Sequence, residues 1–229
     1  MATPNHTNFD ANRLVYSTTS IPRQGGGRYA RIGYDNLQNQ VRVQLGESPR
    51  DACRAPFGID FAVKDDPTSC KQVKLELTQE KKAFFEGFEA ETVAAAEANS
   101  QGWFGRPKPN AMHNSLIKSQ NGDRPDVVQI KISEGRNGPK TTVEVTICQN
   151  GQFTTPKEGS IDDITENVSV LALIRVQGGV YLMNKSYGTS LVADHILVVK
   201  DGGASSGLKR KIDYGDFKFI DNPCEDDEE

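Results

Sequence analysis

Three stretches of the chain interleave basic and aromatic side chains. Cations neutralise the phosphates of a nucleic acid, and aromatic rings stack on unpaired bases, each stack contributing about 1–3 kcal/mol. Together, these residue types could hold a single-stranded nucleic acid. The stretches are Arg28-Tyr29-Ala30-Arg31-Ile32-Gly33-Tyr34, Trp103-Phe104-Gly105-Arg106-Pro107-Lys108 and Tyr181-Leu182-Met183-Asn184-Lys185-Ser186-Tyr187.

The candidate binding residues come from these stretches and from cations in strand-like runs. Trp103 is the strongest stacking candidate, because an exposed Gly-rich loop is a poor place to bury the only Trp, although it could also close the end of a barrel. Any one aromatic residue could instead fill the core. As phosphate contacts we predict Arg28, Arg31, Arg42, Arg106, Lys108, Lys131, Arg175 and Lys185, and as stacking or wall residues Tyr34, Trp103, Phe104, Tyr181 and Tyr187.

Alternation of apolar and polar residues places most of these side chains on short strands. Asp35-Asn36 predicts a hairpin between the first two strands, and Gln177-Gly178-Gly179 predicts another tight hairpin. A run of helix formers at 78–99 predicts one long helix, with Thr78 as its cap. Such a chain is α+β and mainly β, an antiparallel barrel or sandwich. The expected strands are 28–34, 41–45, 71–77, 127–132, 141–148, 168–176, 180–184 and 190–200.

Three regions are expected along the chain. Residues 1–27 are polar and end in Gly25-Gly26-Gly27, which predicts a flexible lead-in. Residues 28–200 hold the strands and the helix and are expected to form one binding domain. Residues 201–229 contain a Gly/Ser linker, the basic run Lys209-Arg210-Lys211 and an acidic tail.

The tail is the strongest charge feature of the chain. Five consecutive carboxylates end the sequence: Glu225, Asp226, Asp227, Glu228 and Glu229. Residues 221–229 carry −6 in a chain of net charge −4, so the other 220 residues sum to +2, too weak an excess to identify nucleic-acid binding by charge alone. Such a tail could be a solubilising end without a partner, or it could mimic DNA and regulate the binding of a strand.

Motifs for catalysis or metal binding are not found. Gly25-Gly26-Gly27 lacks the Lys-Ser/Thr ending of a phosphate-binding loop, no Gly-x-Ser-x-Gly or His-x-x-x-His pattern occurs, and Asp162-Asp163 fits a cap better than an acid–base pair. The four cysteines include no C-x-x-C pair, which argues against zinc, and at Cys53 and Cys70 free thiols are favoured over a disulfide. We expect no cofactor, no metal and no enzymatic activity, and an enzyme with an unrecognised site is kept as a third hypothesis.

No membrane or export signal is found either. The start of the sequence lacks the apolar core of a signal peptide, and no run approaches the ~18 apolar residues of a membrane helix. An intracellular, non-secreted protein is therefore expected.

In the order of its elements and in several short motifs, the chain resembles the single-stranded-DNA-binding proteins of T7-like phages and of large nucleocytoplasmic DNA viruses. The late block at 168–175, 178–181, 187–191 and 196–199 is similar in both groups. The resemblance covers most of residues 28–200. The residues shared with the viral proteins in particular are Pro56-Phe57-Gly58, Asn99-Ser100, Trp103-Phe104 and Lys185-Ser186-Tyr187-Gly188.

The resemblance implies an oligonucleotide/oligosaccharide-binding (OB-like) barrel with the long helix inserted after the early strands. Such proteins coat unwound DNA without sequence preference in replication, recombination or repair, and their acidic tail docks a replication polymerase or helicase/primase. A viral protein would act in the host nucleus or at a cytoplasmic replication site. The tail here lacks the terminal aromatic residue of the phage proteins, which puts docking in doubt and favours competition with DNA for the groove.

Two alternatives stay open at this point. RNA is not separated from single-stranded DNA, because stacking and phosphate contacts do not read the 2′-hydroxyl. A structural or scaffold protein without a nucleic-acid role is the second hypothesis. A scaffold should assemble without nucleic acid, whereas a DNA-binding protein of this kind should be a monomer or a homodimer.

Overall fold

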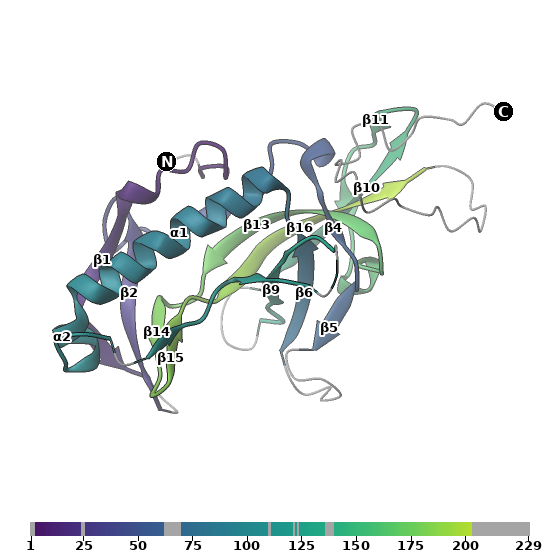
Figure 1. The fold of residues 1–229 in the computed structure, drawn as a ribbon. Coiled ribbons are helices and arrows are strands. Elements are labelled where there is room, and N and C mark those ends of the chain that lie inside the picture. Colours follow the sequence, from purple (N-terminus) through teal and green to yellow (C-terminus); the bar gives the residue numbers. More distant parts are fainter. Residues whose placement is uncertain are drawn as a thin grey trace.

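Two β-sheets and one long helix make up the fold (Figure 1). The computed structural model describes residues 3–23, 26–61, 70–109, 111–120, 122, 124–135 and 140–202. The basic run and the acidic tail predicted above lie outside these residues. The five-stranded sheet has the order β1 (Leu14–Pro22), β2 (Arg28–Tyr34), β14 (Val180–Leu182), β15 (Ser186–Gly188) and β7 (Met112–His113).

The eleven-stranded sheet is organised around its longest strand, β16 (Leu191–Asp201). β16 runs antiparallel to β13 (Val168–Val176) and parallel to both β10 (Thr142–Gln149) and β9 (Val127–Ile132). The remaining strands are β3 (Arg42–Gln44), β4 (Cys53–Ala55), β5 (Ile59–Phe61), β6 (Lys71–Glu76), β8 (Ile117–Lys118), β11 (Gln152–Phe153) and β12 (Lys157–Glu158).

The mainly-β fold with one long helix after the early strands is confirmed, but the antiparallel barrel is not found. Both sheets are mixed: β16 runs parallel to β10 and β9 in the eleven-stranded sheet, and β7 runs parallel to β15 in the five-stranded sheet. In the part of the chain that the structure describes, no hydrogen-bonded ladder joins β4 to β6, and the sheet does not close into a barrel there. An Arg54–Glu76 ion pair of 3.2 Å links these two strands through their side chains instead. A strand lies at each of the eight expected places, but alternation carries no information on the partners or directions of these strands.

Both expected hairpins are wrong. β2 pairs with β1 and β14, whereas β3 pairs with β13, so Asp35-Asn36 does not connect two paired strands. At Gln177-Gly178-Gly179 the chain leaves β13 in one sheet and enters β14 in the other. Pairing of distant segments, rather than the local turn signal, decides the topology at both places.

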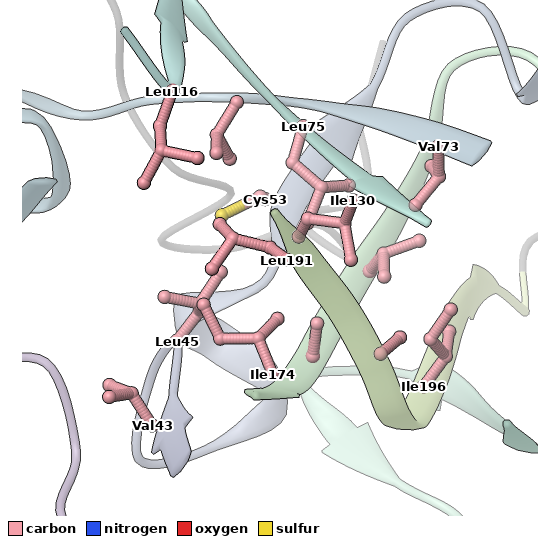
Figure 2. Packing of buried hydrophobic residues seen from close by; sticks show 14 of the residues in the cluster. Val43, Leu45, Cys53, Val73, Leu75, Leu116, Ile130, Ile174, Leu191 and Ile196 are labelled. Atoms are coloured by element: carbon pink, nitrogen blue, oxygen red, sulfur yellow. The ribbon is translucent and has the colours of Figure 1, made fainter. Parts of the chain in front are cut away.

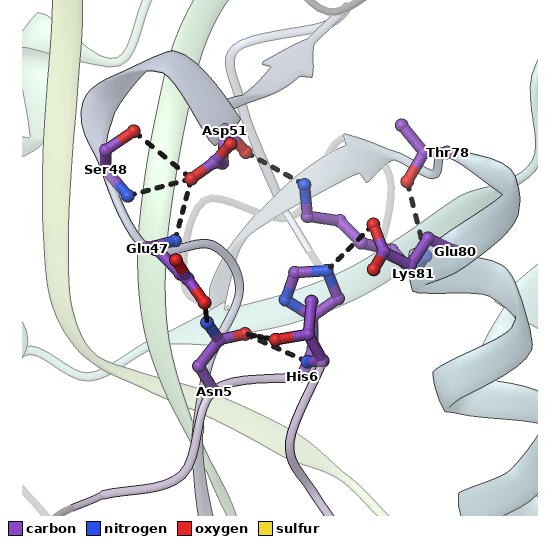
Figure 3. A network of polar contacts seen from close by, with 9 residues as sticks. Asn5, His6, Glu47, Ser48, Asp51, Thr78, Glu80 and Lys81 are labelled. Carbon is purple, nitrogen blue, oxygen red and sulfur yellow. Dashed lines mark hydrogen bonds and ion pairs between the residues drawn. The ribbon is translucent and has the colours of Figure 1, made fainter.

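The polar segment 1–27 contains β1, a nine-residue strand that pairs antiparallel with β2. Sequence analysis missed β1 because its middle is polar and its register shifts between Tyr16 and Ser20. Before it, the N-terminal residues lie along β3, where Asn5 forms a parallel bridge with Gln44. Figure 3 shows how polar contacts tie this segment to the neighbouring loop and helix. The described ranges also contain three short 3-10 helices, Ala11–Arg13, Pro49–Asp51 and Ile161–Asp163.

The helix α1 (Gln79–Ala98) lies against both sheets, and α2 (Ser100–Phe104) follows it directly. Thr78 caps α1 as predicted, its hydroxyl accepting from the Lys81 amide at 3.2 Å. Phe85 and Phe88 pack into the core of the eleven-stranded sheet, whereas Ala96 packs against the five-stranded sheet. One helix therefore fixes the position of one sheet relative to the other.

The main hydrophobic core is formed mostly by side chains of the eleven-stranded sheet, with Phe85 and Phe88 of α1 packed against them (Figure 2). Ile130, Ile196 and Leu45 are fully buried in it. Cys53, also in this core, and the exposed Cys70 are both free thiols, as expected.

Candidate nucleic-acid interface

The five-stranded sheet has one face covered by helices and one face left open. Successive residues of a strand point to opposite faces. Ala30, Val180 and Leu182 lie in the buried cluster beneath α1 and α2, so Tyr29 and Tyr181, their neighbours in sequence, point the other way. We call the face that carries Tyr29 and Tyr181 the open face.

Tyr29 and Tyr181 are direct cross-strand partners between β2 and β14. Residues paired in this way have Cβ atoms about 4.5–5.5 Å apart. Both side chains are half-buried, and hollows of the protein surface adjoin them. The open face thus presents two neighbouring aromatic rings.

The Tyr181 ring is held by its neighbours. Its hydroxyl accepts a hydrogen bond from Asn114 Nδ2 at 2.8 Å, and Asn114 Oδ1 in turn accepts from Lys118 Nζ at 2.8 Å. Gly188 lies opposite Tyr181 on β15, and a Cβ there would come within 3.3 Å of the tyrosine hydroxyl oxygen. Glycine therefore leaves room for the ring, and Asn114 fixes its orientation.

Two crossings between the sheets border the open face. The chain passes from β13 to β14 through Gln177–Gly179, and from β15 to β16 through residues 189–190. The Gln177 amide donates to the Ser190 carbonyl at 2.8 Å, which ties the crossings together. A Cβ at Gly179, whose φ is +132°, would lie 2.2 Å from the Ala30 carbonyl oxygen, so only glycine fits there.

Lys131 of β9 extends toward this border from the eleven-stranded sheet. Its Nζ lies 3.4 Å from both Gln177 Oε1 and Ser190 Oγ. These are long contacts to neutral groups, and they leave the lysine charge without a carboxylate partner among the described residues. The ammonium group is therefore positioned but not neutralised.

Three adjoining hollows follow the open face and its border. Tyr29 lines the first and second, while Tyr181 and Lys131 line the second and third. No Asp or Glu is among the described residues that line any of the three. The cations that line them are Arg23, Arg31, Lys118 and Lys131. Because neighbouring hollows share lining residues, we treat the three as one groove. None of the four cations forms an ion pair with a described carboxylate, so the groove attracts anions.

The opposite face of this sheet holds most of the aromatic residues that the sequence singled out. Trp103 is only 2% exposed, and its indole N–H donates to the Ser17 carbonyl at 2.7 Å. Phe104 packs edge-on against Tyr187 at 5.6 Å between ring centroids, and burial raises the pKa of Tyr187. The expectation that Trp103 lies in an exposed loop is wrong, because α2 forms there and packs the indole onto the sheet.

Several predicted cations are committed to contacts within the fold. Arg42 and Arg175 both pair with Asp194, Arg42 Nε at 3.0 Å from Oδ2 and Arg175 Nε at 2.5 Å from Oδ1. Arg28 donates to the hydroxyl and the carbonyl of Ser20 on the helix-covered side. These side chains would have to exchange internal partners for a phosphate.

Of the thirteen predicted residues, the structure brings Arg31, Tyr181 and Lys131 together along the groove. Lys185 is exposed in the turn after β14, and Arg106 and Lys108 are exposed after α2. Tyr34 is buried beside Phe9, with 4.9 Å between ring centroids, and is part of the core.

Sequence analysis missed Arg23, Tyr29 and Lys118 as groove residues. Tyr29 could have been found, because it shares its strand face with Arg31. Arg23 and Lys118 carry no such signal, since a single surface cation outside an aromatic run has no distinctive pattern. Their place in the groove depends on pairings that join residues far apart in the sequence.

Neither a metal-ligand cluster nor a membrane-spanning helix is found in the described part of the chain. The described residues contain no group of three or more His, Cys, Asp or Glu side chains placed to hold a metal ion. No helix in the described ranges is long and apolar enough to cross a membrane.

No protein-family model matches the chain, and no curated protein matches it. Among solved structures, it is similar to the single-stranded DNA-binding protein from bacteriophage Enc34, with 11% identity and a TM-score of 0.38 over 86% of this chain and 97% of the other. A C-terminal truncation of that protein gives 13% identity and a TM-score of 0.39 over 84% and 98%, and its complex with ssDNA gives 11% and 0.39 over 80% and 95%. TM-scores below 0.5 do not establish a shared fold.

Proposed function

We propose that this protein binds single-stranded DNA without sequence preference along the open face of its five-stranded sheet. The single observation that carries the proposal is the groove itself: two adjacent tyrosines and four cations without described carboxylate partners, lined by no described acidic residue. Rings stack on bases of any type, and cations neutralise the phosphates between them.

The groove chemistry favours a single strand over a duplex. Stacking on Tyr29 and Tyr181 requires base faces that are not already stacked within a helix. Lys131 and Arg31 line the same groove, where they can meet the backbone of a strand whose bases point toward the rings. None of these groups is specific for one base, so sequence-independent binding is expected.

Fluorescence anisotropy with a labelled oligo-dT of about 12 nucleotides tests the proposal. Tyr29→Ala and Tyr181→Ala should each weaken binding roughly 5-fold to 150-fold, because each removes one stacking ring. Phe57→Ala is the matched control: Phe57 is an aromatic residue 40% exposed with Lys74 Nζ 5.4 Å from its ring centroid, but it lies away from the groove. Loss of affinity in the Phe57 variant with unchanged Tyr variants would refute the assignment of the open face.

The same assay with oligo-rU and with a duplex of matched length defines the ligand class. Duplex binding should be far weaker than oligo-dT binding, since paired bases present no free ring face. Equal affinity for oligo-dT and oligo-rU would assign the protein to single strands in general. Absence of salt-sensitive binding to any strand would favour the scaffold alternative, as would assembly into large oligomers without nucleic acid.

We also propose that the acidic residues of 221–229 compete with DNA for the groove. The proposal is supported by their charge of −6 and by the cations in the groove that lack a described carboxylate partner. A chain ending at Ile220 should bind every strand more tightly and keep the same preference among strands. Unchanged affinity after this truncation would leave the tail with a solubilising role.

A further inference from the structure

Two methionines continue the open face beyond Tyr181. Met183 lies two residues after Tyr181 and therefore on the same face, and its amide donates to the Ser186 carbonyl at 2.9 Å, which continues the β14–β15 pairing. Met112 of β7 is the register partner of Ser186. Met183, Ser186 and Met112 thus form a row across three neighbouring segments of the sheet.

These side chains are unusually exposed for their type. Met112 is 79% exposed and Met183 60%, although methionine is among the residues most often buried. The chain contains three methionines in all, so two of them occupy one row on one surface. Single exposed apolar residues are normal on protein surfaces, but a row in register with a binding residue indicates a contact surface.

Resting on the proposed function, we infer that Met112 and Met183 extend the DNA-binding face and contact the bases that follow those stacked on the tyrosines. Two residues along a strand span about 6.7 Å, so Met183 lies next to Tyr181 in the path of the same strand. The thioether is flexible and polarisable and interacts favourably with aromatic rings, and it can adapt to any base. Such contacts suit binding without sequence preference.

The charge around the row favours a nucleic acid over a protein partner. Residues 105–120 and 177–190, which surround the methionines in sequence, contain no Asp or Glu. The same two segments carry Arg106, Lys108, Lys118 and Lys185. Glu89, which accepts from Ser115 Oγ at 2.9 Å, comes from α1 on the helix-covered side. A polyanion is the occupant that complements an apolar row whose own segments carry cations and no carboxylates.

NMR of protein labelled at the methionine methyl groups tests the contact directly in the full chain. Met112→Leu and Met183→Leu assign the two signals. Both signals should shift or broaden when oligo-dT is added at a stoichiometric amount. If the Tyr29 and Tyr181 variants lose affinity but neither methyl signal responds in the wild type, the extension is refuted while the proposed function stands.

Binding measurements against oligonucleotide length give a second test. Combined Met112→Ala and Met183→Ala should weaken binding of an oligo-dT of about 12 nucleotides threefold to tenfold, and affect one of about 4 nucleotides less. The matched control is Ile147→Ala, which removes an apolar side chain 37% exposed on β10 of the other sheet. Equal losses at both lengths would contradict the extended path. Methyl shifts that depend on protein concentration without DNA would instead assign the row to self-association.

Discussion

Two regions of the protein surface, the groove along the open face and the outer part of the eleven-stranded sheet, use their cations differently. In the eleven-stranded sheet, basic side chains contact carboxylates: Lys71 pairs with Glu134 at 2.7 Å, and Lys74 with Asp60 at 3.0 Å. In the groove beside the open face, Arg31 of the five-stranded sheet and Lys131, which reaches the groove from β9 of the eleven-stranded sheet, have no such partner among the described residues. Exposed ion pairs contribute only about 0–1 kcal/mol to stability, so the pairs do little for the fold, but they cancel the local positive potential.

The difference teaches where to look for a ligand in a chain that is nearly neutral. The net charge of the protein does not identify a polyanion-binding surface, because cations and carboxylates are present in similar numbers. What matters is which cations remain unneutralised beside free aromatic rings. By that criterion the proposed binding surface is the open face of the five-stranded sheet, and the eleven-stranded sheet supplies the large core together with Lys118 and Lys131 at the border of that face.

The largest expected effect tests the junction that joins the sheets. Gly179→Ala should destabilise the protein by about 3 kcal/mol or more, because it combines an unfavourable positive φ with a Cβ 2.2 Å from the Ala30 carbonyl oxygen. Gly178→Ala is the matched control, since Gly178 also has a positive φ of +73° but open space around its Cβ position, and about 1 kcal/mol is expected. Urea unfolding measures both. An equal loss of unfolding free energy in the two variants would show that the backbone near Ala30 moves away from the new Cβ without destabilising the protein.

This junction also shows what could be predicted from the sequence. The strand at 168–176 and the Thr78 cap were found because they depend on alternation and on one residue's local chemistry. The Gln177–Gly179 crossing was mistaken for a hairpin because its turn residues are the same in both cases. Which strand a segment pairs with depends on distant residues, and that information is not in the local pattern.

The site was only partly predictable for the same reason. Basic-aromatic interleaving singled out Tyr181 and Arg31, which the structure places along one groove, but it did not say which face of the sheet each side chain occupies. Trp103 and Tyr187 carry the same signal in sequence as Tyr181, and both are buried beneath the helices. Arg175 resembles a free phosphate contact until Asp194, nineteen residues away, is placed beside it.

The second prediction separates the two faces of the five-stranded sheet. Trp103→Phe removes the indole N–H that bonds the Ser17 carbonyl and should lower the free energy of unfolding by about 1–2 kcal/mol while leaving DNA affinity unchanged. Tyr29→Ala should weaken DNA binding and leave the free energy of unfolding nearly unchanged. The intrinsic fluorescence of Trp103 should also change little on adding oligo-dT, because the indole is buried on the other side. Strong quenching by static contact would place DNA on the helix-covered face and overturn the comparison.

A third prediction compares an unpaired cation with a paired one. Lys131→Gln should weaken oligo-dT binding and lower the slope of log affinity against log salt by about 0.7, the value for one phosphate contact on a single strand. Lys74→Gln makes the same change in net charge but removes a lysine paired with Asp60, so its slope should stay at the wild-type value. Identical slopes for the two variants would mean that binding responds only to overall charge.

The smallest effect concerns pH and lies at the edge of the eleven-stranded sheet. His6 is buried, and neither of its ring nitrogens has a hydrogen-bond partner among the described residues, Nε2 lying 3.8 Å from Glu80 Oε2 (Figure 3). Burial lowers the pKa of His6, and the nearby Lys81 charge lowers it further, whereas Glu80 and Asp51 act in the opposite direction.

Because the pKa of His6 is lower in the folded than in the unfolded protein, its neutral form favours folding, and this contribution is complete above the unfolded value near 6.5. As the pH falls below that value, the unfolded chain takes up a proton first and stability declines. His6→Gln should therefore flatten the pH dependence of urea unfolding below about pH 6.5. The open face carries no histidine or carboxylate among its described lining residues, so oligo-dT affinity should not follow this decline while the protein remains folded. A parallel loss of affinity and stability in the wild type, abolished by His6→Gln, would show that the two sheets are coupled and that the division between support and binding surface is incomplete.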